Sequence, residues 1–184
     1  MLNFCLKKEE KNLLKSLIGK KLIKYRHDSL DKFGGDTVYS RVEFFLDDTI
    51  ILIGYDYGPY PLFGNNNDDH PKFFIKTISE DNAVSALQNT NQIDVECEEI
   101  ITSITLVEDG MIVEWDGKKD SVCVLKAIVF NFGNKKLILQ GDYMIPLIDV
   151  LKGKNAQEQL LPPGDEFSNN PDIKYNAERF YVEL

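Results

Sequence analysis

Two stretches of the chain, residues 44–57 and 130–143, align without a gap and share one order of features: strand, tight turn, strand and then Asp-Tyr. A duplicated hairpin would leave this order behind, and chance similarity between two hairpins would leave it as well. Both explanations predict a fold built on β-hairpins. Three residue pairs are identical between the two stretches: Phe44 and Phe130, Asp56 and Asp142, and Tyr57 and Tyr143.

The second half of the chain carries repeated turn signals. Asp116-Gly117 and Gly133-Asn134 separate runs rich in β-branched and aromatic residues, which is a strong short-range signal for antiparallel hairpins. Glu108-Asp109-Gly110 has the same character and predicts a further turn. The sequence therefore predicts an antiparallel meander within a β-rich half over about residues 94–150.

A first β-rich half is predicted over about residues 20–78. Its strand-like segments are rich in Val, Ile, Phe and Tyr and are separated by polar or glycine-containing turns. The predicted strands are Leu22–His27, Val38–Leu46, Thr49–Tyr55 and Phe73–Ile78.

Helices are predicted at the periphery. Residues 7–18 place four apolar side chains on one stripe among lysines and glutamates, and Gly19 follows where a helix commonly ends. Two shorter helices are predicted over residues 79–88 and 144–152. The C-terminal extension, residues 153–184, is broken by a Leu-Pro-Pro-Gly sequence.

These elements predict a single α+β domain over residues 1–184, mainly antiparallel β, with two β-rich halves and a few peripheral helices. A chain of 184 residues can bury roughly 70% of the surface that its unfolded form exposes, which is enough for one core. No linker rich in Pro, Gly or Ser separates the halves. The extension is expected to return to a sheet through a last strand over residues 178–184.

The charge of the chain is acidic and unevenly spread. Its formal net charge is −9, but eight of the 21 Lys and Arg residues lie before residue 27, so the remaining body is near −15. Such a field disfavours nucleic acid and anionic membranes, and it favours basic partners or bound cations. Solubility alone would also explain this charge.

The cysteines and the N-terminal sequence indicate a reducing, cytoplasmic location. Cys5, Cys97 and Cys123 are odd in number and show no Cys-x-x-Cys spacing, so neither a zinc site nor a disulfide framework is predicted. Cys123 lies in an apolar run, where an inert buried thiol is the usual outcome. The first residues do not resemble a signal peptide, and no stretch approaches the ~20 apolar residues of a membrane span.

Residues 54–71 form the candidate functional segment, because they lack a repeating apolar pattern over eighteen residues. Tyrosines offer a large contact area with one polar tip, and beside acids they suit a surface that binds lysines and arginines of a protein. A carbohydrate surface would use similar rings, and a packed Ω-type loop would bury them. The candidate binding residues are Tyr55, Asp56, Tyr57, Tyr60, Phe63, Asp68, Asp69 and His70.

Motifs that would name a reaction are missing from the sequence. Asn65, Asn67 and Asp69 alternate like calcium ligands, but the glycine and the late glutamate of an EF-hand loop are not in place. Only His27 and His70 could serve as histidine bases, and no nucleophile or phosphate-loop motif accompanies them. We therefore expect no metal, no cofactor and no catalytic residue.

The sequence favours a cytoplasmic, non-enzymatic protein that binds a basic protein partner through an acidic, tyrosine-rich surface. In size, acidity and lack of motifs the chain resembles the diverse bacterial immunity proteins. The resemblance implies inhibition of a toxin domain and carries over no residue. The alternative is a small-ligand carrier or enzyme whose pocket lies between the two halves, lined by Asp56-Tyr57 and Asp142-Tyr143.

Overall fold

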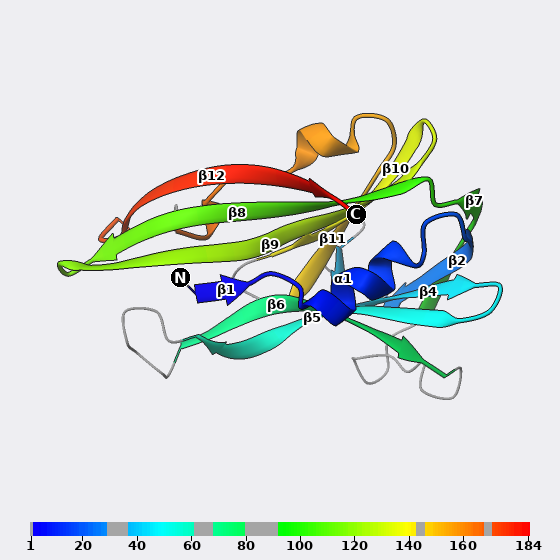
Figure 1. The fold of residues 1–184 in the computed structure, drawn as a ribbon, viewed down its shortest axis with the longest axis horizontal. Coiled ribbons are helices and arrows are strands. Elements are labelled where there is room, and N and C mark those ends of the chain that lie inside the picture. Colours follow the sequence, from blue (N-terminus) through cyan, green and yellow to red (C-terminus); the bar gives the residue numbers. More distant parts are fainter. Residues whose placement is uncertain (1, 29–36, 61–67, 80–91, 143–145, 168–170) are drawn as a thin grey trace.

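The structure, a computed structural model, is built mostly of antiparallel strands in two sheets, with a single α-helix in the part of the chain that it describes (Figure 1). No helix within that part is long and apolar enough to cross a membrane. The described residues are 2–28, 37–60, 68–79, 92–142, 146–167 and 171–184.

The larger sheet has seven strands in the order β12-β8-β9-β10-β11-β3, and β1 pairs with β9. All of its pairings are antiparallel except the parallel pairing of β1 with β9. Its strands are β1 (Leu2–Phe4), β3 (Thr37–Tyr39), β8 (Ser103–Trp115), β9 (Lys118–Phe132), β10 (Lys135–Gly141), β11 (Leu147–Lys152) and β12 (Lys174–Glu183).

The smaller sheet has five antiparallel strands in the order β6-β5-β4-β2-β7. Most of it comes from the predicted first half, and most of the larger sheet comes from the predicted second half. Two strands are exchanged, since β3 joins the larger sheet and β7 the smaller one. The strands of the smaller sheet are β2 (Lys21–Asp28), β4 (Arg41–Leu46), β5 (Ile50–Tyr60), β6 (Asp68–Ile78) and β7 (Gln92–Ile100).

The main core lies between the two sheets. The rings of Phe44 on β4 and Phe130 on β9 have their centroids 4.7 Å apart, and both side chains are fully buried. Helix α1 (Lys8–Lys15) contacts both sheets: the backbone N–H of Ile75 donates to Glu10, and Lys11 donates to Glu108. The helix prediction over residues 7–18 is thus confirmed in a shorter form.

The outer side of the larger sheet carries two 3₁₀ turns, η3 (Ala156–Gln159) and η4 (Asp165–Phe167). Ala156 packs with Val107, Ala127 and other residues of that side, and Phe167 packs in a second small cluster with Met111 and Val113. The C-terminal extension therefore covers part of the larger sheet before it returns as β12, which confirms the predicted last strand.

Ser40 divides what the sequence predicts as one strand over Val38–Leu46. Its φ of +59° turns the chain from β3 in the larger sheet to β4 in the smaller sheet. The corner is held by backbone hydrogen bonds from Ser40 N–H to the carbonyl of Pro146 and from Tyr55 N–H to the carbonyl of Ser40. The prediction of one unbroken strand is wrong, because the pattern of apolar residues is the same whether a chain stays in one sheet or passes from one sheet to another.

The turns at Asp116-Gly117 and Gly133-Asn134 are confirmed. Trp115 pairs with Lys118 and Phe132 with Lys135, so each turn closes a hairpin, and Gly117 and Gly133 adopt the positive φ that such turns require.

Two local predictions are wrong. Glu108-Asp109-Gly110 is no turn, because β8 runs straight through it and Asp109 is fixed by a buried ion pair with Arg179. Residues 147–152 of the predicted third helix form β11, an apolar strand covered on both sides, which sequence periodicity cannot distinguish from a buried helix. Residues 80–88 of the predicted second helix lie outside the described residues.

Candidate functional site

The predicted loop over residues 54–71 is mostly a β-hairpin. Strand β5 continues to Tyr60 and β6 begins at Asp68, and these two residues are partners in the antiparallel register. The loop prediction is corrected in this respect. The side chains of Tyr60, Asp68 and Asp69, and all of Phe63, lie outside the part of the chain that the structure describes.

Tyr55 belongs to the core, so its predicted place on an exposed surface is wrong. The side chain is 5% exposed, and its ring centroid lies 4.6 Å from that of Phe73. Gly141 on the larger sheet makes room for this ring, since a Cβ atom at Gly141 would lie 2.4 Å from the ring of Tyr55. The ring thus joins the two sheets.

The substitution Gly141→Ala is expected to lower the free energy of unfolding by about 1–3 kcal/mol, because the added methyl group forces a buried ring out of its place. Urea denaturation measures this loss. Gly58→Ala is the matched control, since its Cβ would meet only the flexible end of Lys72. Equal effects of the two substitutions would contradict the close contact between Gly141 and Tyr55.

His70 is also buried, which corrects its predicted exposure. It is 3% exposed and its ring centroid lies 5.3 Å from that of Phe4. Burial, together with the positive charge of Lys126, lowers the pKa of His70 to about 4. The imidazole is therefore neutral at physiological pH.

Asp56 and Tyr57 are exposed as predicted, and Tyr57 keeps 45% of its surface accessible. Alternation along a strand places Tyr57 on the same side of β5 as Tyr55, which points into the core. The core-facing side of the smaller sheet therefore continues past the core and meets solvent at Tyr57.

The larger sheet shows the same feature on strands β8 and β12. Leu106 points into the core, and Ile112 lies on the same side of β8 but is 46% exposed. Phe180 is the register partner of Glu108 on this side and is also 46% exposed. Its ring lies over Gly110, where an added Cβ atom would approach the ring to 3.0 Å.

A shallow hollow of about 210 Å³ lies beside these side chains on β8, β9 and β12. The residues that line it include Gly110, Ile112, Ser121, Asn176, Glu178 and Phe180. The sequence did not predict this surface, because its exposed apolar residues lie in strands whose sequence pattern is that of ordinary core strands.

Both hairpins, β5–β6 and β8–β9, extend toward the same end of the molecule, with β1 near them (Figure 1). We call the exposed, core-facing side chains of Tyr57, Ile112 and Phe180 together the open inner face. Among the described side chains of residues 56–72 and 114–120, four are acidic (Asp56, Glu114, Asp116 and Asp120) and three are lysines (Lys72, Lys118 and Lys119). The described side chains at this end therefore combine exposed apolar groups with a small excess of acids.

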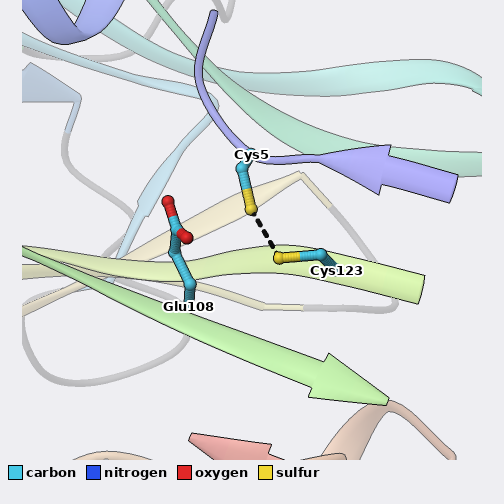
Figure 2. A group of neighbouring side chains, drawn as sticks. All are labelled: Cys5, Glu108 and Cys123. Carbon is cyan, nitrogen blue, oxygen red and sulfur yellow. Dashed lines mark hydrogen bonds between the residues drawn. The ribbon is translucent and has the colours of Figure 1, made fainter. Parts of the chain in front are cut away.

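A cluster of two thiols, a carboxylate and an ammonium lies beside the open inner face. The Sγ atoms of Cys5 and Cys123 are 2.9 Å apart, and Lys11 Nζ donates a hydrogen bond of 2.8 Å to Glu108 Oε1. Figure 2 shows the two sulfur atoms pointing toward one another with the carboxylate of Glu108 beside them. Cys5 follows β1, Glu108 belongs to β8 and Cys123 to β9.

The two thiols titrate differently. The hydrogen bond with Cys123, followed by burial, raises the pKa of Cys5. The same hydrogen bond lowers the pKa of Cys123. Either sulfur can be the donor in this contact, and Cys123 is the thiol whose pKa is lowered. The prediction of a fully buried Cys123 is wrong, since the thiol is half-buried and lies beside Cys5, from which 118 residues of sequence separate it.

The cluster could offer three ligands to a metal ion, since one ligand atom each from Cys5, Glu108 and Cys123 lies within 4.8 Å of the others. Two thiolates on a tetrahedral zinc ion, each at about 2.3 Å from it, would be roughly 3.8 Å apart. The observed sulfur separation is shorter, and Lys11 already binds the carboxylate. The geometry therefore fits a hydrogen-bonded thiol pair better than a metal centre.

Comparison of the chain with protein-family models, with curated proteins and with solved structures found no match in any of the three.

Proposed function

We propose that the protein is a non-enzymatic, cytoplasmic binding protein that engages a basic protein partner through the open inner face. The observation that supports this most is the exposure of Tyr57, Ile112 and Phe180 on the core-facing sides of β5, β8 and β12, near the end to which both hairpins extend. An immunity-type inhibitor of a bacterial toxin would use such a surface, and the acidity of the chain suits a basic toxin domain.

In the proposed surface, apolar and charged groups contribute differently to binding. Aromatic side chains that become buried in an interface supply most of the binding energy and slow dissociation. Acids around them, such as Asp56 and Glu114, speed association with a positively charged partner. Tyr55 and His70, although buried, support the β5–β6 hairpin that presents Tyr57.

The double substitution Tyr57→Ala/Phe180→Ala is expected to weaken binding of the partner at least about 30-fold, because each ring contributes on the order of 1–2 kcal/mol once desolvated. The melting temperature should change little, since both side chains are nearly half exposed. Ile100→Ala is the matched control. Ile100 is 57% exposed and is the last residue of β7, so it lies near the start of β8, whereas the hairpin turn follows the end of β8. Titration calorimetry and thermal unfolding measure the two effects.

The partner is to be captured from the source cell on the immobilised full chain, at low and at raised salt. The proposal expects a basic protein that the wild type and Ile100→Ala retain, that the double variant loses, and whose capture weakens with salt. Capture that survives the double substitution, or that is indifferent to salt, would refute the proposed surface.

The alternative, a small-ligand site between the two sheets, has weaker support. A hollow of about 210 Å³ lies between β2 and β7 on one side and β9 and β10 on the other, with Tyr25, Cys97 and Lys152 in its wall. Ligand pockets usually hold 300–1,000 Å³. Neither Asp56 nor Asp142 is among the residues that line this hollow.

We also propose that the α+β domain contains a pseudo-repeat, with the β4–β5 and β9–β10 hairpins as copies of one ancestor. The matched residues Phe44 and Phe130 contact one another across the core, which two facing copies would explain. A set of related sequences in which the two hairpins are more alike than in this chain would support duplication.

A further inference from the structure

The thiol cluster has the chemical parts of a redox site. Cys5 and Cys123 are both half-buried, so solvent reaches them in part. Their sulfur atoms lie within hydrogen-bond distance, and a disulfide requires a further approach to about 2.05 Å. Redox-sensitive cysteines are typically accessible, have thiolate character and lie next to a second thiol that can resolve the first product. The geometry of this pair meets the first and third conditions, and the lowered pKa of Cys123 favours the second.

The hydrogen bond with Cys5 lowers the pKa of Cys123, which favours a thiolate at that position. Burial and the carboxylate of Glu108 act in the opposite sense, and the hydrogen bond is the largest of these effects. The ammonium of Lys11, which donates to Glu108, lowers the pKa of Cys123 by a smaller amount. Cys97 has no thiol partner among the described residues, and burial raises its pKa.

The hollow on β8, β9 and β12 gives this site a neighbouring binding surface. Gly110 is the register partner of Cys123 and lines the hollow together with Ser121 and Phe180. The ring of Phe180 lies over Gly110 and forms one wall of the hollow. Ser121 and Val122, which precede Cys123 on β9, also line the hollow, so a small disulfide bound there would lie near Cys123.

We propose that Cys123 and Cys5 form a thiol–disulfide exchange site for small-molecule disulfides of the glutathione type, with Cys123 as the attacking residue and Cys5 as the resolving one. This proposal is independent of the proposed binding function. It is a modification site that ties β1 to β9 by a covalent bond when the disulfide pool becomes oxidising.

The exchange proceeds in two balanced steps. The thiolate of Cys123 attacks one sulfur of the small disulfide, the disulfide bond breaks, and one small thiol leaves with a proton from solvent. Cys5 then loses its proton and attacks the sulfur of Cys123 in the mixed disulfide, which releases the second small thiol. Two cysteine thiols are oxidised and one small disulfide is reduced to two thiols.

The test incubates the full-length protein with oxidised glutathione at neutral pH, blocks remaining thiols by alkylation and identifies the products by peptide mass. The proposal expects one Cys5–Cys123 disulfide, with Cys97 alkylated. Initial reaction at Cys123 should be at least about tenfold faster than at Cys97, because the thiolate is the reacting species. The oxidised protein should melt at least about 5 °C higher, because a long loop is closed.

Variants separate the two roles. Cys5→Ser should stop the reaction at a glutathione adduct on Cys123, whereas Cys97→Ser should behave as the wild type. Lys11→Gln should slow the first step at least about threefold, and Lys15→Gln, on the same helix, should not. Lys11 is a positioning residue in this scheme, so the reaction rate of the Lys11→Gln variant, and not its folding, measures the role of Lys11.

Three results would overturn the proposal. The first is a disulfide or adduct that involves Cys97 at a rate equal to that of Cys123. The second is a Cys5→Ser variant with no adduct at Cys123. The third is stoichiometric zinc in the purified protein that protects Cys5 and Cys123 from alkylation, which would make the cluster a metal site instead.

Discussion

Replacing Arg179 with methionine is expected to lower the free energy of unfolding by about 3–5 kcal/mol, since a buried carboxylate would lose its counter-ion. Arg179 Nε and Nη2 each donate a 2.7 Å hydrogen bond to Asp109, and Nη1 donates one of 2.7 Å to the carbonyl of Leu161. The side chain of Asp109 is fully buried and that of Arg179 is 11% exposed. The pair joins β8, β12 and the chain segment after η3.

Urea denaturation of Arg179→Met gives this loss, and two further variants define its cause. Lys20→Met removes a partner of the exposed ion pair with Asp48 and should cost no more than about 1 kcal/mol. Asp109→Leu/Arg179→Met removes both buried charges and should be more stable than Arg179→Met alone. If Arg179→Met costs no more than Lys20→Met, the buried pair does not stabilise the sheet as described.

Acidification from pH 6.5 to pH 4 is expected to reduce the stability of the protein by up to about 3 kcal/mol through His70 alone. The pKa of His70 is about 4 in the folded protein, below its ordinary value of 6.5. The unfolded chain therefore binds a proton first as the pH falls. The contribution is fully present above pH 6.5, declines through the window, and is lost below about pH 4.

Unfolding free energies measured across this window for the wild type and for His70→Gln test the assignment. The glutamine variant has no imidazole to protonate, so its stability should depend less steeply on pH between 6.5 and 4. Carboxylates that titrate near pH 4 affect both proteins alike and cancel in the comparison. Identical slopes for the two proteins would show that His70 titrates as an exposed histidine does.

Local sequence signals were sufficient for much of the fold. The hairpins at Asp116-Gly117 and Gly133-Asn134 depend on residues that favour positive φ, and such preferences act over two residues. The strands β2, β5 and β12 follow from β-branched and aromatic runs.

Features that depend on distant partners could not be predicted from the sequence. The sequence of Asp109-Gly110 predicts a turn. In the structure Arg179 and Phe180, about seventy residues later, contact these two residues and hold them within β8. The sequence around Tyr55 predicts an exposed ring, but the ring lies in the core, where Gly141 leaves room for it.

The candidate site, too, could be predicted from the sequence only in part. Tyr57 and Asp56 could be identified from composition, but the thiol pair could not, because the pairing of β1 with β9 places Cys5 beside Cys123. Ile112 and Phe180 likewise have the sequence context of core residues. Their exposure follows from the length of the β8–β9 hairpin, which extends past the region where the sheets cover one another.

Hydroxyl-radical footprinting of the protein, alone and with its captured partner, tests the open inner face most directly. In the isolated protein Tyr57, Ile112 and Phe180 should be oxidised readily and Tyr55 should not, because only the first three are exposed. In the complex these three should become protected at least about fivefold while Ile100 stays reactive. Protection of Ile100 instead, or unchanged oxidation of Tyr57 and Phe180, would contradict the account.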